Sequence, residues 1–436
     1  MSPDPTQPQL VRAIGRWTLT ALVLNCIIAS GIFGLPDDVA RLVGPAAPWA
    51  YLMAAAGIAF IMAAFAEVSS QFREAGGPYL YAREAFGPLA GIQTAWFAWL
   101  TRVTASAAIA NIFVGYLEEF WPGSTAPLPR ALLLIGLLAV LTVVNIRGVR
   151  GGARLNNAIT IAKLVPLAVF IVIGLVLAPR GTPTPLAAAP TLVNWIDALV
   201  VLLFAFGGFE SSLMAAGETK DPRADAPFAL LVGLVIVALI YLCAHIVAMW
   251  SLPGLATSER PLADAARVFA GDGGARMIAI GATLSTLGAL CGGIVTAPRM
   301  IYALGERGDF PKIFAAVHPR YRTPYVSIIF WAVLVLGLAL WGNFLWNAVL
   351  SVSARLVSYG MTCAALIQMR RRHPTAGAWR APAGNWVALI GIAFCALLAT
   401  SLTPTHAAIM AIVALVALIN WRRVRRHANA VVPATP

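Results

Sequence analysis

Long apolar segments alternate with short polar connections along almost the whole chain, beginning near Trp17. Roughly twelve of these segments are long enough to cross the ~30 Å hydrocarbon core of a bilayer as an α-helix. The pattern therefore predicts an all-α, polytopic membrane protein with these spans: Trp17–Leu42, Pro48–Gln71, Leu89–Leu117, Ala131–Val144, Ile159–Leu177, Trp195–Ala216, Pro227–Trp250, Met277–Leu304, Val326–Trp341, Leu345–Met369, Trp386–Thr400 and Ala407–Trp421.

Two of these spans are interrupted by residues that disfavour a continuous helix. The first contains Ser30-Gly31-Ile32-Phe33-Gly34 followed by Pro36, and the sixth contains Gly207-Gly208. Glycine costs a helix about 1 kcal/mol and proline about 3 kcal/mol relative to alanine. In a bilayer a broken helix is tolerated only where its freed backbone groups meet protein, water or a ligand.

The first interruption has the features of an anion site. Unpaired N–H groups of Ser30, Gly31 and Ile32 would lie at the start of a half-helix, where a carboxylate binds favourably. Matching breaks in two halves of a chain are typical of secondary transporters, and an odd repeat of five spans inverts the second half. The structural alternative for Ser30-Gly31 is a close contact between helices through small residues.

Composition supports a membrane protein and changes the interpretation of the positive net charge. The chain of 436 residues is 60% hydrophobic and only 11% charged, with a net charge of +13. Its basic residues cluster in the connections predicted to face the cytoplasm and in the C-terminal Arg422-Arg423-Arg425-Arg426. This distribution sets topology and lipid contact, so it predicts cytoplasmic termini and no nucleic-acid partner. The predominance of arginine over lysine favours a bacterial inner membrane.

Five of the charged residues within or at the edge of predicted spans are candidates for function, because charge in a membrane is costly. They are Glu67, Arg102, Lys163, Glu210 and Arg355. The five cysteines also lie in apolar segments without a metal-binding spacing, so we interpret them as small core residues.

Several motifs resemble the amino acid–polyamine–organocation permeases, which share the LeuT-type fold of two inverted five-helix repeats. The matching strings are Ser30-Gly31-Ile32-Phe33, Glu67-Val68-Ser69 with Ala75-Gly76-Gly77-Pro78-Tyr79-Leu80-Tyr81-Ala82-Arg83-Glu84-Ala85-Phe86-Gly87, Phe204 to Glu210 with Gly217-Glu218 and Pro222, and Pro298-Arg299-Met300 through Gly308. The resemblance implies a cytoplasmic tail at 1–16, repeats at 17–180 and 194–370, added helices at 385–421 and a basic tail at 422–436.

By this resemblance an amino acid binds between the two broken helices. Its carboxylate would meet the N–H groups of Ser30, Gly31 and Ile32, and its ammonium the carbonyls of Ile27, Phe204 and Ala205. Phe204 stands where the family has a large side chain that closes over the substrate, although packing alone also explains an aromatic residue there. The residues expected to select the side chain are small or apolar, which favours a neutral substrate of modest size: Ser106, Ile109, Gly207, Gly293 and Ser353.

Arg102 departs from the family, which usually has a small or neutral residue at this place. It would narrow the site or favour an acidic side chain if it faces the cavity, or it would neutralise Glu210. Glu210 is correspondingly either a proton carrier or a fixed partner of Arg102, and we expect the two to be coupled. Arg355 either donates to backbone carbonyls or pairs with a carboxylate.

Lys163 resembles a lysine that stands in for the sodium ion in several sodium-independent relatives. It would bond freed carbonyls near Ile28 and Ala29 and hydroxyls of Ser285 or Thr286. The alternative is that its ammonium extends to the cytoplasmic interface. These expectations together predict a sodium-independent exchanger or proton-coupled symporter of amino acids.

Other functions have less support in the sequence. A membrane enzyme would need a convergent catalytic set, and His245 is a single span histidine without one. A polyamine or organic-cation permease is the alternative carrier, but it predicts acidic residues around the cavity. No cofactor is predicted, membrane lipids are the expected surroundings, and the substrate's identity and the oligomeric state stay open.

Overall fold

The computed structural model describes residues 15–72, 77–148, 152–181, 186, 188–219, 221–372 and 379–431. Within these ranges, side chains are described except at 152–162, 214–218, 222–223 and 426–431. The predicted N-terminal tail up to residue 14, Ala75-Gly76 of the loop motif and residues 432–436 of the basic tail lie outside the described residues.

The described residues form a bundle of α-helices without a β-strand. The first half contains α1 (Arg16–Ile27), α2 (Gly31–Gly34), α3 (Pro36–Val43), α4 (Ala47–Ser70), α5 (Pro78–Phe86), α6 (Pro88–Leu117), α7 (Pro127–Arg147) and α8 (Gly152–Leu177). The second half contains α9 (Leu192–Phe206), the 3-10 helix η2 (Phe209–Glu218), α10 (Pro222–Ser251), α11 (Pro261–Glu306), η4 (Lys312–Ala315), α12 (Tyr325–Trp341), α13 (Phe344–Arg372), α14 (Gly384–Ala399) and α15 (Pro404–Val431).

Every predicted span coincides with helix in the structure, with breaks at 28–30 in the first span and at 207–208 in the sixth. Nine helical stretches of the described chain are long and apolar enough to cross a membrane, and three shorter apolar helices accompany them: Lys163–Leu177, Tyr325–Trp341 and Gly384–Ala399. The prediction of an all-α membrane protein is therefore confirmed. The boundaries differ most at α11, which begins at Pro261 rather than near Met277 and bends at Gly271, where φ is 64°.

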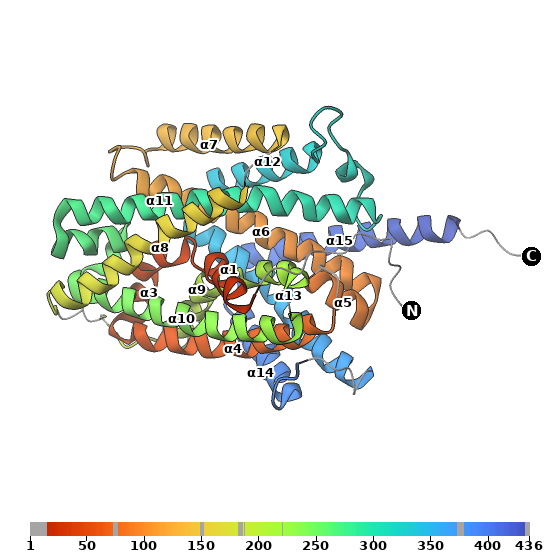
Figure 1. Ribbon diagram of the computed structural model, residues 1–436, viewed down its shortest axis with the longest axis horizontal. Coiled ribbons are helices and arrows are strands. Elements are labelled where there is room, and N and C mark those ends of the chain that lie inside the picture. The colour runs from red at the N-terminus through yellow and green to blue at the C-terminus, as the bar shows by residue number, and fades with distance from the viewer. Residues whose placement is uncertain are drawn as a thin grey trace, which may run out of the picture.

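The helices run mostly along one direction, with the two interrupted ones in the middle (Figure 1). Helix α6 packs against α13 and α11, α10 packs against α1 and α4, and α8 packs against α11. Helix α13 is largely buried, whereas α7 and α15 are largely exposed and carry apolar side chains outward. Helices α7 and α14 lie at opposite edges of the view.

Glu67 is the buried acidic residue that holds α4 to α13. Its side chain is 1% exposed, and its two carboxylate oxygens accept from Arg370 Nε and Nη2, each at 2.6 Å. The same carboxylate accepts from the backbone N–H of Ala381, and Arg370 also donates to the Ala381 carbonyl. One bidentate pair thus joins α4, α13 and the segment before α14.

Removing one partner of this pair should destabilise the protein strongly. Glu67→Ala or Arg370→Ala leaves the other charge without its counter-ion, at a cost of about 3–5 kcal/mol for a buried pair. We expect each single variant to have a markedly lower midpoint of thermal unfolding in detergent than the Glu67→Ala/Arg370→Ala double variant. A double variant that loses the sum of the two single losses would contradict this coupling.

Candidate functional site

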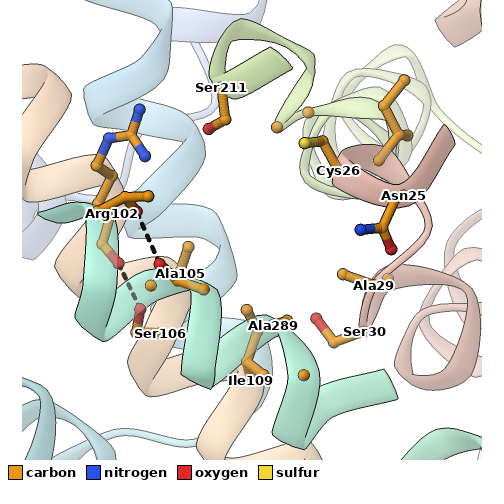
Figure 2. A pocket seen from close by; sticks show the side chains of 18 of the residues that line it. Asn25, Cys26, Ala29, Ser30, Arg102, Ala105, Ser106, Ile109, Ser211 and Ala289 are labelled. Atoms are coloured by element: carbon orange, nitrogen blue, oxygen red, sulfur yellow. Dashed lines mark hydrogen bonds between the residues drawn. The ribbon is translucent and has the colours of Figure 1, made fainter. Parts of the chain in front are cut away.

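A cavity of about 330 Å³ lies beside the interruptions of both broken helices. Figure 2 shows residues of α6 on one side of it and residues of the first broken helix on the other. It is lined by Leu22, Asn25, Cys26, Ile27, Ala29, Ser30, Gly31, Thr101, Arg102, Ala105, Ser106, Ile109, Lys163, Phe204, Gly207, Gly208, Glu210, Ser211, Ser285, Gly288, Ala289, Gly292, Gly293, Thr296 and Arg355. A volume of this size suits a small organic ligand.

The first helix breaks where predicted, between Ile27 and Gly31. Ile28 has extended backbone angles after the end of α1, and α2 begins at Gly31. A Cβ at Gly31 would lie 2.6 Å from the Ala205 Cα on α9. Glycine is required here because the two broken helices touch each other through their backbones, so the small-residue helix contact is present as well.

The second break follows α9 and depends on two glycines. Gly207 is extended, and Gly208 has a φ of +103°, a region that favours glycine. A Cβ at Gly207 would collide with the Arg355 guanidinium. The backbone N–H of Gly208 donates to Glu210 Oε2 at 3.0 Å, so this carboxylate caps the break from within the same segment.

Tyr241 and Lys163 lie within hydrogen-bond distance of carbonyls that the breaks release. The Tyr241 hydroxyl lies 3.1 Å from both the Ile27 and the Ala205 carbonyl oxygens. Lys163 Nζ donates to the carbonyls of Asn25 at 2.8 Å and Ile28 at 2.5 Å. In the membrane interior such carbonyls need partners, and the protein itself supplies them.

Lys163 is only 3% exposed, so the structure does not extend it to the surface. The expected bond to the Ile28 carbonyl is present, whereas the expected bond to Ala29 is replaced. The Ala29 carbonyl accepts from the Ser285 hydroxyl at 3.1 Å, and Asn25 supplies the second acceptor for Lys163.

Glu210 pairs with Arg355 rather than with Arg102, which corrects the expected partner. Arg355 Nε lies 3.5 Å from Glu210 Oε1, and the Tyr359 hydroxyl donates to Oε2 at 2.9 Å. Arg102 is near enough for its charge to act on the carboxylate but forms no ion pair with it. Arg355, and not Arg102, pairs with Glu210 because its guanidinium lies against the Gly207-Gly208 turn that precedes Glu210.

Most residues predicted for the site line the cavity, and three do not. Those that line it are Ile27, Ser30, Gly31, Arg102, Ser106, Ile109, Lys163, Phe204, Gly207, Glu210 and Gly293. Ile32 is buried behind the break, and Ala205 faces Gly31. Ser353 turns its hydroxyl back to the Val349 carbonyl of its own helix.

Sequence reasoning missed Tyr241 and Tyr359, the two hydroxyls that hold the breaks. Both lie in apolar helices, where the sequence offers no signal that separates a hydrogen-bonding tyrosine from a packing one. It also missed the cavity position of Cys26, which was interpreted as a core residue. His245 packs against the Tyr51 ring at 4.9 Å.

The chain matches the amino acid permease family over residues 14–419, and it therefore belongs to that family. It is 28% identical over 372 residues to the serine/threonine exchanger SteT of Bacillus subtilis, covering 83% of this chain and 84% of that protein. It is 25% identical over 418 residues to the methylthioribose transporter of Bacillus subtilis, covering 91% and 89%. It is 29% identical over 357 residues to a putative arginine/ornithine antiporter of Bacillus subtilis, covering 72% and 74%.

Family membership confirms the resemblance drawn from the motifs. The protein is a multi-pass membrane permease and not an enzyme.

Adding a single methyl group at Gly31 should disrupt the site. Gly31→Ala places a Cβ 2.6 Å from the Ala205 Cα and 2.8 Å from its Cβ, so one broken helix must move away from the other. We expect a clear loss of substrate uptake in cells or proteoliposomes. The matched control is Gly115→Ala on α6, where a Cβ meets nothing within 4 Å. Equal uptake by the two variants would argue against the close contact.

The Arg355–Glu210 pair should be energetically coupled. In a cycle of Arg355→Gln, Glu210→Gln and the double variant, unfolding midpoints should give an interaction energy of about 0.5–3 kcal/mol, as for residues in direct contact. The same cycle with Arg102→Gln should give a smaller value, because Arg102 makes no ion pair. A larger coupling for Arg102 than for Arg355 would reverse the assignment made here.

Proposed function

We propose that this permease is a sodium-independent secondary transporter of amino acids that works by alternating access. The observation that carries the proposal is the Lys163 ammonium on the carbonyls of Asn25 and Ile28. A buried cation on freed carbonyls at the first break performs the task of a bound sodium ion without requiring one. A sodium-dependent carrier would leave these carbonyls for the metal.

The LeuT-type arrangement is part of the proposal. The first and sixth spans are both interrupted beside one cavity, which supports inverted repeats at 17–180 and 194–370 followed by the two helices at 385–421. The basic clusters support twelve spans with both termini in the cytoplasm of a bacterial inner membrane.

The amino acid would bind with its carboxylate at Ser30, Gly31 and the amide of Ile32. Ser30 Oγ is buried and has no hydrogen-bond partner among the described residues, so a donor and acceptor is unused at this place. The ammonium would donate to the Ile27 or Ala205 carbonyl oxygen, because these two acceptors share the single proton of the Tyr241 hydroxyl and each keeps a free lone pair. Phe204 is part of the cavity wall.

The cavity is closed at one end and open at the other. Phe204 is buried and meets the Phe344 ring at 5.9 Å, and Ile112 fills the space beside Gly34. In contrast, the lining residues Gly292 and Thr296 are exposed toward the end of α11. With cytoplasmic termini this arrangement supports an inward-open state, from which substrate would leave into the cell.

The charges around the cavity bear on the substrate class and on the mode of transport. Arg102, Lys163 and Arg355 line the cavity together with a single carboxylate, Glu210, and this excess of positive charge disfavours a polyamine or other polycation as the substrate. Glu210 already has the partners Arg355, Tyr359 and Gly208, so it is poorly suited to carry a proton. Exchange of amino acids is therefore the better supported mode of transport.

Transport should need Lys163 but not sodium. We expect proteoliposome uptake of labelled amino acids to be the same in sodium and in choline buffers. Lys163→Ala should lose most uptake even at saturating sodium, because the freed carbonyls of Asn25 and Ile28 lose their donor. Preloading the vesicles with unlabelled amino acid should stimulate uptake if the protein is an exchanger.

The control for charge removal is Lys312→Ala, which alters an exposed lysine on η4 and should retain uptake. A steep dependence of wild-type uptake on sodium, or normal uptake by Lys163→Ala, would remove this lysine from the mechanism.

A further inference from the structure

We propose that Arg102 is the anchor of an anionic subsite and that the preferred substrate is an amino acid with an acidic side chain. This inference rests on the proposed amino-acid transport and names its substrate class. It also revises the expectation, drawn from small lining residues, of a neutral substrate.

Arg102 has no hydrogen-bond or ion-pair partner for its guanidinium among the described residues, although the side chain lines the cavity. A guanidinium carries five N–H donors, and a positive charge that is only partly exposed inside a membrane protein is costly without a counter-ion. Lys163, by contrast, is engaged by two carbonyls, and Arg355 faces Glu210.

The cavity is also short of negative charge. Arg102, Lys163 and Arg355 carry three positive charges at its wall, and Glu210 is the one carboxylate among its lining residues. Arg355 Nη1 is itself buried without a hydrogen-bond partner among the described residues. A zwitterionic neutral amino acid would add no net charge, whereas one with a side-chain carboxylate would supply the missing negative charge where the field is strongest.

The geometry separates the two carboxylates of such a substrate. Ser30 and Ala29 lie on one side of the cavity, and Arg102 lies on the opposite side, with its guanidinium directed toward Ser211 (Figure 2). A backbone carboxylate held at Ser30-Gly31 would therefore leave the side chain directed toward Arg102. Ser106 lies one turn further along α6, and its hydroxyl donates to the Arg102 carbonyl. Because serine is small, it leaves space between Ser30 and Arg102 for the substrate side chain.

Arginine suits this role better than lysine because its planar fork binds a carboxylate through two parallel hydrogen bonds. The same positive charge would repel the side chain of lysine, ornithine or arginine. We therefore expect cationic amino acids to be poor substrates, although one relative is a putative arginine/ornithine antiporter.

The test uses pairs of amino acids that differ in charge but hardly in shape. Wild-type proteoliposomes should take up glutamate in preference to glutamine and aspartate in preference to asparagine. Arg102→Gln should lower glutamate uptake relative to glutamine by about tenfold or more, the effect of one lost charge-assisted hydrogen bond. Arg102→Lys should retain part of the preference. Arg276→Gln, which removes an exposed charge on α11, should leave it unchanged.

A second measurement does not depend on an Arg102 variant being folded. Cys26 lines the cavity, so its thiol reports the local charge on the wild-type protein. An anionic methanethiosulfonate should modify it faster than a cationic one of similar size, and glutamate should protect it better than glutamine. Cys26→Ser identifies the signal that comes from this thiol.

The outcomes separate the two proposals. Uptake of neutral amino acids without a preference for the acidic ones, or a preference that survives Arg102→Gln, would overturn the anionic subsite alone. No uptake of any amino acid by the wild-type protein would overturn the proposed function and this inference with it.

Discussion

The structure depends on satisfying the backbone carbonyls released where two membrane helices stop and restart. Lipid offers no hydrogen-bond donors, so each freed carbonyl must find one inside the protein. The Tyr241 hydroxyl lies between the Ile27 and Ala205 carbonyls and so bridges the two breaks. Lys163 holds the first break from α8, and Ser285 holds it from α11. Because these donors come from three surrounding helices, the breaks remain open only when the whole bundle is assembled.

The second break is held by a carboxylate in addition to hydroxyl groups. The Glu210 carboxylate accepts a hydrogen bond from the Gly208 N–H of its own segment. From α13, the Tyr359 hydroxyl donates a second hydrogen bond and Arg355 forms an ion pair. Gly207 has no side chain because the Arg355 guanidinium occupies that space. The two glycines and the ion pair therefore form one unit: the turn makes room for the arginine, and the arginine neutralises the carboxylate that caps the turn.

The distribution of charge connects this architecture with substrate choice. Each of the other cations at the cavity has a partner supplied by the protein, which leaves the Arg102 guanidinium for a ligand. Three relatives are named for different substrates, namely serine and threonine, methylthioribose, and arginine and ornithine. Sequence similarity to these relatives therefore does not name the substrate, so substrate choice must be argued from the site itself.

The sequence by itself determined the membrane class, the helical segments and the positions of both breaks. These follow from local chemistry, namely runs of apolar residues and glycine pairs that disfavour a helix wherever they occur. For Lys163, the family resemblance suggested bonds to freed carbonyls but left open an ammonium that extends to the cytoplasmic interface, and the structure places it on the carbonyls of Asn25 and Ile28. Only the tertiary structure decided which charge pairs with Glu210, because Arg102 and Arg355 are both far from it in the chain. Likewise, only packing distinguished the bridging Tyr241 from other aromatic residues, and directed Ser353 away from the cavity. Such choices depend on distances between helices, and hydrophobic pattern carries no information about those distances.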